Sequence, residues 1–128
     1  MRIEEICRAN APKYARQLAC RRIHDLLDSH AHALAGAEAA IDGDRRLTYA
    51  DVAKEVDAIA RALIAIGVER GDRVCTLAPS SVEFWLTYLA TVSIGAIWMG
   101  LNPRYQLPEY AYLLSDATPK LVFSFLDF

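Results

Sequence analysis

The sequence predicts an α/β domain, a parallel βαβαβ sheet with flanking helices, preceded by a helix and a short β-hairpin. Short apolar strands alternate with helical segments from residue 50 onward, and continuous apolar strands are typical of a parallel sheet with right-handed crossovers. The 128 residues are 54% hydrophobic and 23% charged, which suits one domain with a core. Three segments follow: 1–16, a poorly defined leader; 17–49, the helix and hairpin; and 50–128, a further helix plus the βαβαβ unit.

The first elements are a helix over about Gln17–Leu34 and a hairpin over Ala37–Asp42 and Arg45–Tyr49. The helix is predicted from leucines and isoleucines at helical spacing. The hairpin is predicted because Gly43, beside Asp42, supplies the positive φ that a tight turn requires.

A second helix is predicted to begin after Thr48, which can cap it with Asp51 as the third residue. Apolar positions then recur every three or four residues, at Tyr49, Val52, Val56, Ile59, Ala60 and Leu63. Asp57 and Arg61 form a supporting pair on the other side, and Gly67 is expected to end the helix in a left-handed conformation.

The remaining elements are strand, helix, strand, helix and strand, over Arg73–Pro79, Ser81–Ile94, Ala96–Leu101, Pro108–Ser115 and Lys120–Phe125. Ser80 and Glu83 have the spacing of a capping box for the first of these helices, which Gly95 is expected to stop. That helix is apolar around nearly its full circumference, and the last strand has no following helix. Because a three-stranded sheet cannot cover such a helix, we expect an incomplete portion of a larger fold that self-associates through exposed apolar surface.

Composition narrows the function classes. A net charge of -2 argues against a nucleic-acid partner. Cys7, Cys20 and Cys75 are too few and too scattered for a disulfide framework, and no secretory signal follows the first residues, so we expect a cytoplasmic protein.

The uncharged run Phe84–Pro103 is long enough to span a bilayer, but threonine, serine, glycine and asparagine interrupt it. A membrane span is therefore the less favoured alternative.

The candidate site residues each have a structural explanation that we prefer. Cys20 and His24, four residues apart, could share a metal ion with His30 or His32, but no carboxylate converges on them, so a solvated face is favoured.

Ser80 and Ser81 lack a nucleophile-elbow motif, and capping accounts for Ser80. Trp85, Tyr88 and Trp98 are interpreted as core rather than as a ligand platform. Since no phosphate-loop or dinucleotide motif is present either, no catalytic, cofactor-binding or metal residue is assigned.

The segment Leu47–Phe125 resembles the opening of the AMP-forming acyl-CoA synthetases, members of the adenylate-forming superfamily. The likeness rests on the order and spacing of short motifs: Leu47-Thr48-Tyr49, Gly67-Val68, Gly71-Asp72-Arg73-Val74, Gly95-Ala96 and Leu101-Asn102-Pro103. The sequence departs from the family pattern at Ser80, where asparagine is common, and at Gly100, where proline is common. The latter is similar to the branch acting on fatty or cyclic carboxylic acids.

The resemblance implies an N-terminal part of an ATP-dependent ligase that makes acyl-CoA from a fatty or related acid through an acyl-adenylate, using ATP, Mg²⁺ and CoA. The family's phosphate loop, adenine segment, ribose-binding aspartate and catalytic lysine cannot be placed on positions of this sequence. Residues 1–128 alone are therefore expected to be inactive. A stand-alone α/β module that dimerises or complements another ligase half is the second hypothesis.

Overall fold

The computed structural model describes residues 22–125. Cys7, Cys20, residues 1–16 and the first five residues of the helix predicted from Gln17 lie outside this range. The elements are α3 (Ile23–Ala33), β1 (Glu38–Asp42), β2 (Arg45–Thr48), α4 (Tyr49–Ala65), β3 (Arg73–Leu77), α5 (Val82–Ser93), β4 (Ile97–Leu101), α6 (Leu107–Ala117) and β5 (Leu121–Ser124).

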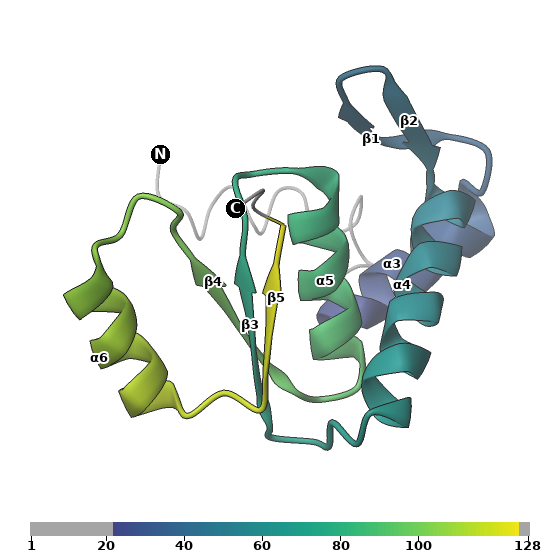
Figure 1. Ribbon diagram of the computed structural model, residues 1–128. Helices are drawn as coiled ribbons and strands as arrows, with labels where there is room; N and C mark the ends of the chain where they lie inside the picture. Colours follow the sequence, from purple (N-terminus) through teal and green to yellow (C-terminus); the bar gives the residue numbers. More distant parts are fainter. Residues whose placement is uncertain (1–21, 126–128) are drawn as a thin grey trace, which may run out of the picture.

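The sheet confirms the predicted α/β class. Its strand order is β4-β3-β5, with both pairs parallel. The central residue Val74 has Trp98 opposite it on one side and Leu121 on the other. Because the chain steps from β3 to one edge and then crosses back to the other, right-handed crossovers put the two connecting helices on opposite faces. Figure 1 shows α5 and α6 on opposite sides of the sheet.

The helix α4 follows its sequence prediction closely. The Thr48 hydroxyl accepts a hydrogen bond from the Asp51 amide (3.2 Å), and the Asp51 carboxylate accepts one from the Thr48 amide (3.0 Å). Val52 and Val56 are fully buried. Gly67 has φ of 87°, the left-handed conformation expected after the last turn.

The hairpin also forms where it was predicted. β1 pairs antiparallel with β2, and Asp42 lies directly opposite Arg45 at the turn. Gly43, the first residue of the two-residue loop, has φ of 57°, a conformation that glycine adopts without strain.

The start of α5 corrects the sequence prediction by one residue. The N-cap is Ser81, whose hydroxyl accepts a hydrogen bond from the Phe84 amide (3.3 Å), and not Ser80. The expected partner of Ser80, Glu83, forms an ion pair with Arg45 of the hairpin instead. A contact between segments distant in sequence therefore replaces the local capping box.

The expectation that α5 lacks cover is also wrong. All its residues are buried or half-buried, because α3 and α4 pack on the side away from the sheet. The core lies between these layers and includes Leu27, Val52, Val56, Leu63, Val74, Leu86, Leu89 and Ala90. The uncharged run that raised a membrane alternative is divided between α5 and β4, and the described part of the chain contains no helix long and apolar enough to cross a bilayer.

Uncovered apolar surface lies instead on the other face of the sheet and on α6. No residue of α6 is buried, and Leu107 and Tyr112 are 83% and 69% exposed. The helix is held at its ends: the Tyr110 hydroxyl donates to the Asn102 carbonyl (2.7 Å) and Arg73 donates to the Ala117 carbonyl (2.8 Å). α6 is therefore tethered beside the sheet rather than packed on it.

Candidate functional site

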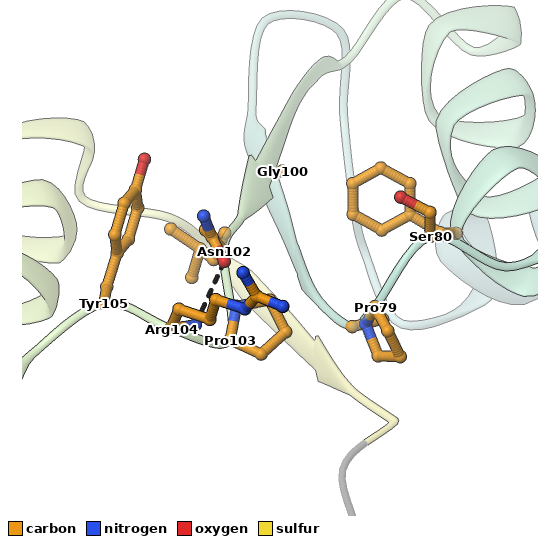
Figure 2. A pocket seen from close by; sticks show the side chains of 10 residues that line it. Pro79, Ser80, Gly100, Asn102, Pro103, Arg104 and Tyr105 are labelled. Atoms are coloured by element: carbon orange, nitrogen blue, oxygen red, sulfur yellow. Dashed lines mark hydrogen bonds between the residues drawn. The ribbon is translucent and has the colours of Figure 1, made fainter.

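A cavity of about 450 Å³ opens at the carboxyl ends of β3 and β4. Ligands of open parallel sheets bind in this place, because the loops leaving the strands meet there. Its lining comes from the loop after β3, the start of α5 and the end of β4 with its following loop: Ala78, Pro79, Ser80, Phe84, Gly100, Leu101, Asn102, Pro103, Arg104 and Tyr105. Figure 2 shows Ser80 and Pro79 on one side of the cavity and Asn102, Arg104 and Tyr105 on the other.

The wall after β4 is a braced turn. The Asn102 side-chain oxygen accepts a hydrogen bond from the Arg104 amide (3.0 Å), drawn as a dashed line in Figure 2. The ring of Tyr105 lies edge-to-face against Tyr110 of α6, with ring centroids 5.9 Å apart. These contacts fix the backbone of the turn, whereas the exposed Arg104 guanidinium forms no hydrogen bond or ion pair with any residue of 22–125.

The floor of the cavity includes the ring of Phe84, which packs against Trp98 behind it. The ring of Phe84 lies edge-on to Trp98, with centroids 4.9 Å apart. The Trp98 indole N–H donates to the Thr76 hydroxyl (3.1 Å), which lies 3.1 Å from the Thr87 hydroxyl. Because Thr87 donates to the Phe84 carbonyl, the Thr76 hydroxyl is left to donate to Thr87. This chain of buried and partly buried hydrogen bonds fixes the indole next to Gly100.

The chemistry of the lining suits an anion. An unpaired guanidinium is a strong donor for phosphate or carboxylate oxygens, with five N–H groups. Among the described residues none that lines the cavity is a carboxylate, so this donor set does not fit Mg²⁺. Cys75 lies on β3 nearby, but burial raises the pKa of its thiol, so it is not an activated nucleophile.

Of the residues that the sequence raised as a possible metal site, Cys20 lies outside the described residues, and His24 and His30 have other partners. His24 lies 3.3 Å from Asp28, and the His30 ring donates to the Leu26 carbonyl (2.7 Å) and stacks on Tyr49. Residues 22–125 contain no cluster of three or more histidine, cysteine, aspartate or glutamate side chains that could hold a metal ion.

Ser80 lines the cavity. Trp85 and Tyr88 are partly buried and pack against the core, and the partly buried Trp98 packs edge-to-face against Tyr88. Sequence reasoning gave no role to Arg104 or to the Asn102 side chain. Their position directly after a parallel strand, where ligand-binding residues gather, is the signal that could have identified them.

The fold and the cavity define an α/β domain with a candidate ligand site at the carboxyl edge of a parallel sheet. Residues 27–127 match the family model of the AMP-binding enzymes. The chain belongs to this family.

Similar proteins share this segment over part of their length. A long-chain fatty-acid CoA ligase of Mycobacterium tuberculosis, FadD13, is 38% identical over 79 residues, which is 62% of this chain and 16% of that ligase. Human mitochondrial medium-chain acyl-CoA ligase ACSF2 is 42% identical over 81 residues, 62% of this chain and 13% of that ligase. The chain thus spans about a sixth or less of these relatives.

A solved structure shows the same fold. The inhibitor-bound N-terminal domain of FACL13 from Mycobacterium tuberculosis superposes with a TM-score of 0.78 at 32% identity, covering 82% of this chain and 27% of that domain. The βαβαβ unit of this chain is therefore the architecture found in N-terminal domains of adenylate-forming enzymes.

Proposed function

We propose that this chain forms part of an AMP-forming acid–CoA ligase and that its carboxyl-edge cavity holds a phosphate-bearing part of ATP or CoA. The observation that carries the proposal is the unpaired Arg104 guanidinium, on a braced turn beside a cavity without an acidic residue. Both co-substrates carry phosphates, which arginine binds with two parallel hydrogen bonds.

A fatty or related carboxylic acid is the proposed acyl substrate, supported by the names of the similar long-chain and medium-chain ligases. In the proposed reaction a carboxylate oxygen attacks the α-phosphorus of ATP and pyrophosphate leaves. The CoA thiolate then attacks the acyl carbon and AMP leaves. No residue of this chain is assigned to either step, and we expect residues 1–128 alone to show no exchange of pyrophosphate into ATP.

Titration of the 128-residue chain with inorganic pyrophosphate tests the cavity. Arg104→Ala is expected to weaken binding at least tenfold, since a hydrogen bond to a charged group contributes about 1.5–3 kcal/mol, and Arg104→Lys should retain part of the affinity. Arg61→Ala is the matched control, because it removes the same charge from α4, where Arg61 pairs with Asp57 (2.7 Å). Equal affinity of Arg104→Ala and Arg61→Ala would exclude the proposed site.

Exposed apolar residues support a second candidate, an interaction module that associates with itself. Leu107, Tyr112, Ile97 and Val122 are all exposed on α6 and the strands beside it, and contiguous apolar surface favours association. Size-exclusion chromatography with light scattering should give a mass above that of one chain. A cooperatively unfolding monomer would contradict this candidate.

We also propose a cytoplasmic location, because the buried Cys75 is a free thiol, as is usual in a reducing compartment.

A further inference from the structure

We propose that Asp42 of the β1–β2 hairpin is a positioning residue for the carboxyl-edge cavity, because it fixes the start of α5 and with it the Ser80 wall. The inference rests on the proposed anion-binding function of that cavity. Asp42 neither lines this carboxyl-edge cavity nor belongs to the three-stranded sheet.

The hairpin is bound to α5 at its first turn. The Asp42 carboxylate accepts a hydrogen bond from the Val82 amide at 2.8 Å, across 40 residues of sequence. Arg45, directly opposite Asp42 in the hairpin, pairs with Glu83 of the same turn and with Glu55 of α4, the latter at 2.6 Å. Two neighbouring groups of the hairpin therefore hold consecutive residues of α5.

The residue that this arrangement positions is Ser80. It lines the carboxyl-edge cavity and also a second cavity of about 340 Å³ between the hairpin and the start of α5, which Asp42 lines as well. The loop containing Ser80 is therefore a wall between the two cavities. A wall open to a cavity on each side has few packing contacts to hold it, so its position depends on the hydrogen bonds at its ends.

The Asp42 carboxylate also affects which groups near the cavity are free to bind an anion. The start of a helix that follows a parallel strand attracts anions through its free amides and its dipole. At α5 the Val82 amide is already bound by Asp42 and the Phe84 amide by Ser81. The Val82 amide is therefore already satisfied by a protein carboxylate, and Arg104, across the cavity, is the charged side chain that can contact a ligand anion.

The test compares the wild-type 128-residue chain with three variants by pyrophosphate titration and by the amide resonances of Ser80 and Val82. Asp42→Ala is expected to weaken pyrophosphate binding about threefold to tenfold, since sites lose activity steeply when their geometry loosens, and to shift the Ser80 resonance. Asp42→Asn keeps an oxygen acceptor and should restore most of both. Asp44→Ala, at the hairpin turn, removes the same charge and should change neither.

The sign of the effect separates positioning from charge. Loss of a negative charge by itself favours anion binding, so weaker binding by Asp42→Ala cannot arise from the altered net charge. Tighter binding would overturn the proposal, since it would show that pyrophosphate takes the freed Val82 amide. An unchanged Ser80 resonance with an altered Val82 resonance would overturn it too, because Asp42 would then be only a helix cap.

Two further results keep the outcomes separate. Wild-type chain that binds no pyrophosphate refutes the proposed anion site, and positioning is then decided by the Ser80 resonance alone. If the alanine variant does not fold, Asp42→Glu replaces it. This variant retains the charge and displaces the carboxylate by one methylene, so an intermediate shift of the Ser80 amide resonance is expected. A Ser80 resonance identical to that of wild type in Asp42→Glu would contradict the proposal.

Discussion

Gly100 offers a sharp test of the cavity floor. A Cβ built on Gly100 would lie 2.7 Å from Trp98 Cη2 and 2.8 Å from Phe84 Cζ, which is closer than real Cβ contacts. Neither ring can move freely, because Trp98 is hydrogen-bonded to Thr76 and packed edge-on to both Phe84 and Tyr88. Gly100→Ala must therefore displace a packed aromatic cluster.

The expected cost is that of overpacking a core, about 1–3 kcal/mol. For a domain of about this size a loss of ~2 kcal/mol lowers Tm by about 10 °C. Urea unfolding followed by tryptophan fluorescence should show a lower midpoint with an unchanged slope, the sign of a stability change without a change in compactness.

Gly36→Ala is the matched control, because nothing lies within 4 Å of a Cβ at Gly36, and it should stay within about 0.5 kcal/mol of wild type. A second change, Phe84→Leu in the Gly100→Ala background, shortens one of the two side chains and should restore part of the stability. A Gly100→Ala midpoint no lower than that of Gly36→Ala would refute the steric argument.

Three further changes test single contacts. Ser81→Ala should lower the free energy of unfolding by about 1 kcal/mol, the usual cost of an N-cap, whereas Ser80→Ala should leave it unchanged; the reverse order in urea unfolding would restore Ser80 as the cap. Thr76→Val leaves the Trp98 indole N–H without its acceptor and should lower the free energy of unfolding by about 1–3 kcal/mol. An unfolding midpoint equal to that of wild type would contradict this expectation. The hydrogen bond from Lys120 lowers the pKa of Asp72, so its stabilising effect is present at neutral pH and is lost as pH falls below about 4. Asp72→Asn should accordingly be less stable than wild type at pH 7 and match it near pH 2 in thermal unfolding, and a difference that persists at low pH would exclude the ion pair as its cause.

Local sequence signals predicted α4 because all its determinants lie within the segment. Thr48 and Asp51 cap it reciprocally, Val52 and Val56 face the core, and Gly67 ends it. Each of these features needs residues no more than a few positions apart, so their spacing can be recognised without knowledge of the fold.

The start of α5 could not be predicted in the same way. Ser80 and Glu83 have the spacing of a capping box, but the partner of Glu83 is Arg45, which is 38 residues away in sequence. Asp42 reaches Val82 over a similar separation. Local propensity gave the helix and its approximate length, whereas tertiary contacts of the hairpin determined which serine caps it.

The candidate site depended on topology. Ser80 and Arg104 are 24 positions apart and meet at one cavity only because β3 and β4 are parallel neighbours whose carboxyl ends lie at the same edge. The motif Leu101-Asn102-Pro103 indicated the family but not a role for the arginine that follows it. Its free guanidinium becomes apparent only when the surrounding side chains are in place.

The sequence predicted that α5 lacks cover, but the structure has its exposed apolar strand residues on the face of the sheet next to α6. The burial of the two sheet faces explains this difference. Continuous apolar strands predict burial on both faces. On the α5 face this holds: Leu121 and Phe123 pack against the core. On the α6 face Ile97 and Val122 are 53% and 41% exposed, because α6 stands at the side of the sheet without a buried residue. Apolar side chains of the strands therefore stay exposed on this second face, and a partner surface that covered Ile97 and Val122 would complete the burial that continuous apolar strands predict.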